Sequence, residues 1–165
     1  MNPLRGPDGP DGPDATDATD GPDASDGTGN ALTNDPSRFI ADFLTSFTDD
    51  ILRGEEDPGT VVDRYHAPGF VQFADGNRID REKLVAHVRP VRKNLIAGRV
   101  EVHEALASGD LIAARYTLYA RMRKQPTATE VCFFGRFTPD GRLREARLLT
   151  RALPADTDGA PARTE

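Results

Sequence analysis

The spacing of apolar residues changes once along this chain, and that change limits the folds the chain can adopt. Phe39, Phe43 and Phe47 recur every four residues, which is the spacing of side chains on one face of an α-helix. From Arg99 onward, apolar and polar residues alternate in long runs, as they do in β-strands. Helices followed by strands are typical of an α+β fold, in which helices pack on a mostly antiparallel sheet.

The helix boundaries are marked by capping residues and turn residues. We expect a first helix to begin after Asn34 or Asp35 as its N-cap and to stop at Gly54. A second, shorter helix is expected to end at the Pro68-Gly69 pair.

A third helix is expected to begin after Asp80 as its N-cap, and Pro90 is expected to kink or divide it. Between the second and third helices, "GFVQF" predicts a short strand and "ADGN" a turn. Two hairpins follow, with turns at residues 108–110 and 139–141, so the chain ends in a four-strand antiparallel meander.

The acidic residues gather at the N-terminus. Asp recurs every third residue from Asp8 to Asp26, and residues 1–35 contain eight Asp and one Arg. Because the repeat lacks aromatic and large aliphatic side chains, we predict a disordered acidic leader over 1–35. Residues 154–165 are predicted to be a disordered tail, which leaves 36–153 as the folded domain. That domain is nearly neutral, so its composition favours no nucleic-acid partner.

The chain shows no targeting segment and no apolar run of the roughly 18 residues that a membrane span needs. The single Cys132 excludes an internal disulfide and fits a reducing compartment, so the expected location is the cytoplasm. The three histidines lie far apart, and there is neither a phosphate-binding loop nor a dinucleotide fingerprint. We therefore expect no metal, cofactor or membrane partner.

Three short motifs, in this order, resemble the nuclear-transport-factor-2-like superfamily. They are the "YHAPGFV" corner, the "DREKL" helix start and the "F-x-x-D-G-R-L" final hairpin. Within the superfamily, residues 36–153 look most like the SnoaL-like polyketide cyclases and the ketosteroid isomerases. The resemblance implies a cone-shaped half-barrel, in which three N-terminal helices pack on a curved sheet around a deep apolar pocket. Members include many dimers, and they include both enzymes and binding modules without catalytic activity.

Alternation along the strands indicates which side chains face that pocket. Arg115 and Arg121 occupy one face of their strand, and this face cannot line an apolar pocket without a large desolvation cost. The opposite face carries Tyr116, and on the last strand the family match points Thr150 inward. The expected ligand-binding residues are Phe43, Phe47, Tyr65, Phe73, Leu118, Met122, Val131, Phe133, Phe137, Leu148 and Thr150.

The resemblance also locates the carboxylates that such enzymes use. By this match, the two acids of the isomerases fall at Phe73 and Phe133, and the last-strand acid of the cyclases falls at Leu148. All three positions are apolar, so carboxylate-driven enolisation is not expected.

The remaining polar candidates for catalysis are His66, Asp75 and Tyr116. A histidine and a carboxylate at a pocket mouth suit a general base and its orienting partner. In the alternative interpretation, His66 is a solvated residue at a helix end, Asp75 belongs to a turn, and Tyr116 is a core residue.

Two functions therefore stay open. One is a cofactor-independent enzyme that cyclises or isomerises a hydrophobic, polyketide-like molecule largely by preorganisation. The other is a non-catalytic module for small-molecule binding or dimerisation. In either case, Tyr119 and Phe134 on the outer sheet face predict a homodimer through that face.

Overall fold

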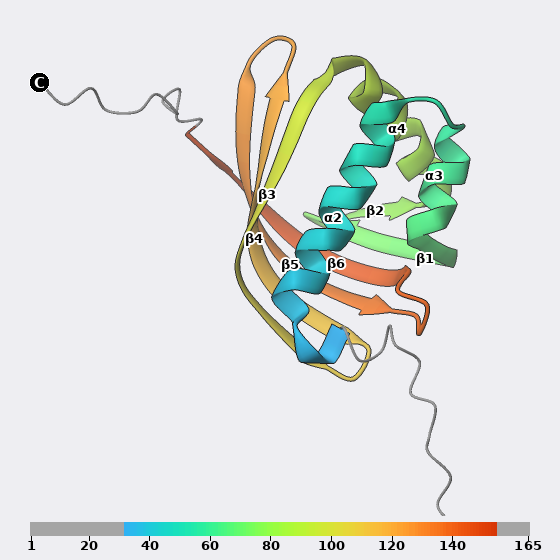
Figure 1. Ribbon diagram of the computed structural model, residues 1–165, viewed down its shortest axis with the longest axis vertical. Coiled ribbons are helices and arrows are strands. Elements are labelled where there is room, and N and C mark those ends of the chain that lie inside the picture. Colours follow the sequence, from blue (N-terminus) through green and yellow to red (C-terminus); the bar gives the residue numbers. More distant parts are fainter. Residues whose placement is uncertain (1–31, 155–165) are drawn as a thin grey trace, which may run out of the picture.

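The computed structural model describes residues 32–154, in which helices cover one face of a curved sheet (Figure 1). After a helical turn at residues 32–34, the helices are α2 (Pro36–Arg53), α3 (Pro58–Tyr65) and α4 (Arg81–Asn94). The strands are β1 (His66–Ala74), β2 (Asn77–Asp80), β3 (Leu95–Ser108), β4 (Leu111–Met122), β5 (Pro126–Phe137) and β6 (Leu143–Leu153).

The six strands form one sheet in the order β2-β1-β6-β5-β4-β3. Only the β1–β6 pair is parallel, and every other neighbouring pair is antiparallel. The hairpins from β3 to β6 form the predicted meander, while β1 and β2 extend the sheet beyond β6. The predicted α+β class, with helices on a curved and mostly antiparallel sheet, is confirmed.

Helix ends follow the local capping signals. The carboxylate of Asp35 accepts a hydrogen bond from the Arg38 N–H at 2.9 Å, and Gly54 ends α2 at a φ of 69°. The carboxylate of Asp80 caps α4 at 3.1 Å from the Lys83 N–H. Pro90 lies inside α4 without dividing it.

The start of β1 differs from the prediction. The second helix ends at Tyr65, before the Pro68-Gly69 pair, and both residues belong to β1. A residue that precedes proline disfavours the helical conformation, which explains an extended Ala67. Gly69 has a φ of 74°, and the pairing of β1 with β6 shifts register between His66 and Val71. Gly69 therefore lies in an irregularity of β1.

The hydrophobic core lies between α2 and the inner face of the sheet. Ile40, Ile112, Val131 and Phe137 are buried there. Leu32 is only 5% exposed and belongs to the same cluster, so packing begins before the predicted boundary at residue 36. The rest of the predicted leader (1–31) and residues 155–165 of the predicted tail lie outside the described residues.

Within residues 32–154, no helix has the length and apolarity needed to cross a membrane.

Candidate functional site

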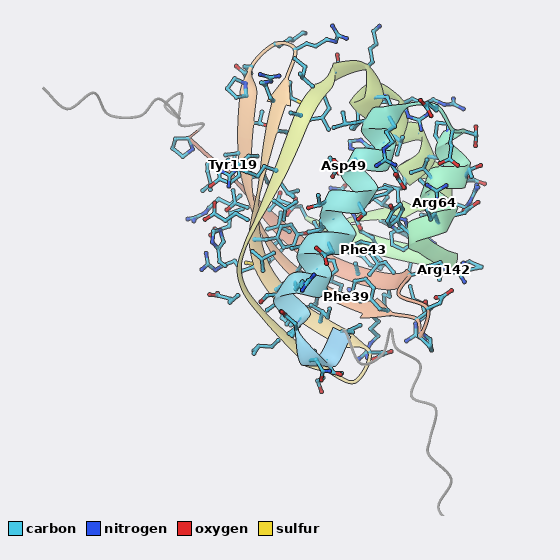
Figure 2. All side chains as sticks on the ribbon, viewed as in Figure 1. Phe39, Phe43, Asp49, Arg64, Tyr119 and Arg142 are labelled. Atoms are coloured by element: carbon cyan, nitrogen blue, oxygen red, sulfur yellow. The ribbon has the colours of Figure 1, made fainter. Side chains whose placement is uncertain are left out.

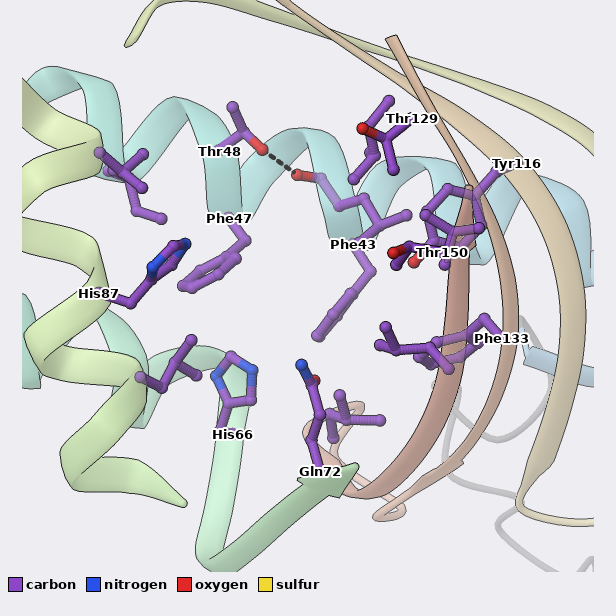
Figure 3. A pocket seen from close by; sticks show the side chains of 18 of the residues that line it. Phe43, Phe47, Thr48, His66, Gln72, His87, Tyr116, Thr129, Phe133 and Thr150 are labelled. Carbon is purple, nitrogen blue, oxygen red and sulfur yellow. Dashed lines mark hydrogen bonds between the residues drawn. The ribbon is translucent and has the colours of Figure 1, made fainter. Parts of the chain in front are cut away.

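A cavity of about 390 Å³ lies between the helices and the inner sheet face (Figure 3). It has the volume of roughly a dozen water molecules, so it suits a small organic molecule. Its walls come from α2, α4 and five strands. The lining residues are Phe43, Leu44, Phe47, Thr48, Ile51, His66, Gln72, Leu84, His87, Val91, Leu95, Tyr116, Leu118, Thr129, Val131, Phe133, Leu143, Leu148 and Thr150.

The sheet face predicted to line the pocket does line it. The wall contains two of the three catalytic candidates, His66 and Tyr116. It also contains seven of the predicted ligand-binding residues: Phe43, Phe47, Leu118, Val131, Phe133, Leu148 and Thr150.

Four predicted ligand-binding residues lie elsewhere. Phe137 is buried in the core against Phe39, with ring centroids 5.0 Å apart. Met122 lies beside Asn94, Arg123 and Lys124 near the β4–β5 hairpin. The Tyr65 ring packs on the aromatic side chains of α2, and its hydroxyl donates a 2.7 Å hydrogen bond to Asp50. The fourth residue is Phe73.

Phe73 lies on the outer face of the sheet, where the Arg147 guanidinium is 4.8 Å from its ring centroid. Phe70 is buried and Gln72 lines the cavity, so even-numbered residues of β1 point inward in this stretch. The prediction for Phe73 was wrong by one residue. Counting alternation from Phe70 would have selected Gln72.

Sequence reasoning also missed His87 and Thr129 as lining residues. His87 lies on α4 and is exposed at one side of the cavity, although its position beside the apolar stripe of this helix suggested only a boundary residue. Thr129 is contributed by β5, two residues before Val131, and therefore shares its face.

His66 lies on the helix-side wall and is only 6% exposed. Its Nδ1 is 2.9 Å from the carbonyl oxygen of Val62, which can only accept, so Nδ1 carries the proton. In the neutral ring, Nε2 then keeps a free lone pair, for which no described residue is a partner. Burial lowers the pKa of His66 to about 4, so the ring is neutral at physiological pH.

Aromatic contacts fix the orientation of the His66 ring. The rings of Phe70, Phe47 and Phe43 lie 4.5, 5.1 and 6.2 Å from it, centroid to centroid. The imidazole is therefore a rigid hydrogen-bond acceptor in the cavity and only a weak base.

Tyr116 lies on the sheet-side wall and is only 3% exposed. Burial raises the pKa of its hydroxyl above the usual range. The hydroxyl has no hydrogen-bond partner among residues 32–154. Among residues 32–154, the one fully enclosed side-chain polar atom without a partner is Nη2 of Arg92. The Tyr116 hydroxyl is therefore not fully enclosed and is open to the cavity. A hydroxyl in this position can pair with water or with a polar group of a ligand.

Asp75 lies at the rim, in the turn between β1 and β2, with a φ of 50°. Its carboxylate accepts hydrogen bonds from the Thr150 N–H at 2.8 Å and from Oγ1 of Thr150 at 2.6 Å. These bonds lower the pKa of Asp75. Asp75 does not line the cavity, but it holds a residue that does.

None of the lining residues is Asp, Glu, Lys or Arg. Phe133 and Leu148, two of the positions matched to family carboxylates, are apolar wall residues, whereas Phe73 is outside the cavity. Residues 32–154 also contain no group of three or more His, Cys, Asp or Glu side chains that could hold a metal ion. The available chemistry is hydrogen bonding by neutral groups in an apolar enclosure.

Comparisons with known proteins agree with this architecture. The profile of the SnoaL-like domain matches residues 40–146. No curated protein sequence matches the chain. The BvnE pinacolase of Penicillium brevicompactum has a similar structure with a TM-score of 0.56 at 11% identity, over 73% of this chain and 83% of that one. An LEH-like epoxide hydrolase of M. tuberculosis has a TM-score of 0.52 at 16% identity, over 70% and 85%.

At these identities, the two structures support the fold alone. The family profile covers more than half of the chain, including most of the helices and of the sheet that enclose the cavity. The protein therefore belongs to the SnoaL-like family of the nuclear-transport-factor-2-like superfamily.

Proposed function

We propose that this protein binds a neutral, largely apolar small molecule in the cavity and catalyses its cyclisation or isomerisation. The observation that carries this proposal is the Tyr116 hydroxyl, which has no partner among residues 32–154 and lies in a wall without Asp, Glu, Lys or Arg. Because this hydroxyl opens on the cavity, a polar group of a bound ligand can pair with it. The family suggests a polyketide-type intermediate as the substrate.

Catalysis would arise mainly from holding a flexible substrate in its reactive conformation, since the wall contains no carboxylate base. His66 would accept a hydrogen bond from the substrate, and Tyr116 would donate one to an oxygen that gains negative charge during the reaction. Asp75 would act as a positioning residue through its bonds to Thr150. The pinacolase and the epoxide hydrolase of similar fold are enzymes by name, which supports a catalytic assignment.

The test begins with native mass spectrometry of the protein purified from its producing cells, which identifies a bound small molecule. The released compound and metabolite extracts of those cells are then incubated with the wild type, His66→Ala and Tyr116→Phe. Conversion should fall about 10-fold or more in both variants, and it should stay unchanged in Tyr119→Phe. Tyr119 is a suitable control because it lies on the face of the sheet away from the helices (Figure 2).

A non-catalytic binding module is the second candidate. The apolar residues Phe133 and Leu148, at positions matched to family carboxylates, favour it. In that case a ligand is bound and released without chemical change, and the two cavity variants lower affinity without altering any product. Absence of both a bound molecule and any conversion would contradict both candidates.

A further inference from the structure

Two polar side chains of the cavity wall are buried, His66 and Tyr116, and they lie on opposite sides. The other polar lining residues, Thr48, Gln72, His87, Thr129 and Thr150, are half-buried or exposed. His66 and His87 are on the helix side, whereas Tyr116 and Thr150 are on the sheet side (Figure 3). We propose that the ligand is a neutral molecule with a hydrogen-bond donor at one end and an acceptor at the other. A ligand hydroxyl binds Nε2 of His66, and a ligand carbonyl binds the Tyr116 hydroxyl. This inference rests on the proposed ligand pocket and adds the chemistry of its occupant.

The His66 end selects a donor. Because Nδ1 is held by the carbonyl of Val62 at 2.9 Å, the tautomer is fixed and Nε2 presents only a lone pair. The contacts with Phe47 and Phe70 prevent the ring from turning to present another atom. A ligand carbonyl at this position would meet a second acceptor, so a hydroxyl is preferred.

The Tyr116 end favours an acceptor, because a phenol hydroxyl donates more strongly than it accepts. Its hydroxyl proton has no partner among the described residues. Thr150 donates its own proton to Asp75 over 2.6 Å, so this neighbouring wall residue is not a free donor for the ligand. A ligand carbonyl would receive the hydrogen bond from Tyr116.

The wall between these two ends is largely apolar, and the one polar residue labelled between them, Gln72, is uncharged (Figure 3). Phe43, Phe133 and Leu148 contribute to it, and no lining residue is an acid, lysine or arginine that could compensate a charge on the ligand. An ionised ligand would lose its hydration without an opposite charge in return. The middle of the ligand is therefore largely apolar, and the molecule as a whole is neutral.

A series of naphthalenes tests this inference directly. The probes are 6-acetyl-2-naphthol, which carries both groups, 2-acetylnaphthalene without the hydroxyl, 2-naphthol without the ketone, and naphthalene. Dissociation constants are measured by calorimetry with the full-length wild-type protein. We expect 6-acetyl-2-naphthol to bind best, with a loss of about 3- to 10-fold for each missing group, the range expected for one neutral hydrogen bond. The charged analogue 6-hydroxy-2-naphthoate should bind more weakly than the ketone.

Two variants assign each end. In His66→Phe, removal of the probe hydroxyl should no longer change affinity, while removal of the ketone should still weaken binding. In Tyr116→Phe, the pattern should be reversed. The comparison of the four probes on the wild-type protein remains valid even if neither variant folds.

Equal affinity of all four probes would overturn the two-ended recognition and leave a general apolar pocket. Absence of binding by every probe would also overturn it. Neither result would decide the proposed function, because conversion of the cellular compound is measured separately. Binding of the probes as inferred, with no conversion of any cellular compound, would instead support the binding module.

Discussion

At the scale of single residues, the cavity wall contains two buried polar side chains. His66 is enclosed as an uncharged imidazole, and the Tyr116 hydroxyl has no hydrogen-bond partner among residues 32–154. A buried group with a shifted pKa that lines a cavity is a candidate for a functional residue. The consequences of both groups for stability are measurable without a known ligand.

The stability of the protein should fall when the pH is lowered from 7 to 5. The pKa of His66 is lowered to about 4 in the folded state, whereas an unfolded histidine has a pKa near 6.5. Between these two pH values, His66 is protonated in the unfolded chain but neutral in the folded protein. The stability that comes from its neutral, buried state is therefore fully present above pH 6.5 and is lost as the pH falls toward 4. The expected decrease in the free energy of unfolding from pH 7 to pH 5 is about 2 kcal/mol.

Urea unfolding at pH 7, 6 and 5 measures this decrease, and His66→Phe should largely remove it. The pKa values of Asp50 and Asp63 are also lowered, from an ordinary value of 3.8. The stability that these two carboxylates contribute is therefore lost only below about pH 4, outside the measured range. The same slope in His66→Phe as in the wild type would show that another group is responsible.

Tyr116→Phe should leave the stability unchanged or raise it by up to about 1 kcal/mol, because the deleted hydroxyl faces the cavity and has no hydrogen-bond partner among residues 32–154. The matched control is Tyr65→Phe, which deletes a hydroxyl bonded to Asp50 at 2.7 Å and should lower stability by about 1 kcal/mol. Both are measured by urea unfolding of the ligand-free protein at pH 7. A clear loss in Tyr116→Phe would mean that the hydroxyl is paired, and would remove the main support for the proposed function.

At the scale of elements, β5 contains one position, Gly135, where the packing leaves no space for a side chain. Phe133 and Gly135 are two residues apart on the same inner face, and the Phe133 ring lies over the Gly135 backbone. A Cβ atom at Gly135 would overlap atoms of that ring and would approach the Leu143 side chain to 3.0 Å. The strand therefore requires glycine for space, with no positive φ at this position.

Gly135→Ala should destabilise the protein by about 1–3 kcal/mol, as overpacking of a core does. The displaced Phe133 ring should also reduce the cavity, so the affinity for 6-acetyl-2-naphthol should fall. Urea unfolding and calorimetry measure the two effects. Adding Phe133→Leu removes the overlapping ring atoms and should restore part of the stability. An unchanged stability in Gly135→Ala would show that the ring moves aside freely.

At the scale of the whole molecule, the two faces of the sheet differ in charge and exposure. The inner face encloses the cavity, while the outer face carries a row of ion pairs across the strands. Arg115 contacts Glu104 and Glu130 at 2.8 and 2.9 Å, and Arg151 contacts Glu130 at 2.7 Å. Beside this row, Leu106, Phe134 and Leu149 are 75%, 55% and 67% exposed.

These apolar side chains are arranged as a band on one face. Leu106 pairs with Ala113, which pairs with Phe134, and Leu149 pairs with Cys132 on the adjacent row. Because both charge signs alternate next to the band, a second copy of the chain can meet it with complementary charges. We propose a homodimer through this face. Tyr119, the other predicted anchor, is covered by the Arg99 guanidinium at 3.9 Å from its ring, so Phe134 is the better anchor.

Light scattering coupled to size-exclusion chromatography should find a dimer for the wild type and a monomer for Phe134→Glu and Leu149→Glu, because each places a carboxylate in the apolar contact. Ile96→Glu is the matched control: Ile96 is similarly exposed but lies near the start of β3, away from the band, and the variant should stay dimeric. A monomeric wild type would contradict the proposed interface.

The order and type of most elements could be predicted from the sequence, because these depend on neighbours along the chain. The caps at Asp35 and Asp80 and the stop at Gly54 act within one helical turn, and alternation along β4 and β5 assigned the cavity face correctly. The family could also be recognised, since the motifs occur in order along one continuous domain. Once the motifs were matched, the sequence also showed that Phe133 and Leu148 occupy positions where the family has carboxylates.

Which side chains meet could not be predicted from the sequence, because it depends on how distant segments pack. The strand β2 has four residues, and its pairing with β1 depends on a sheet edge that no local pattern encodes. Alternation along β1 shows which residues share a face, but it does not show which of the two faces points inward. Phe73 was therefore predicted to face the cavity, whereas its neighbour Gln72 does. The neutral state of His66 and the unpaired Tyr116 hydroxyl arise from enclosure by segments far apart in the chain, because burial is a property of packing and not of sequence spacing.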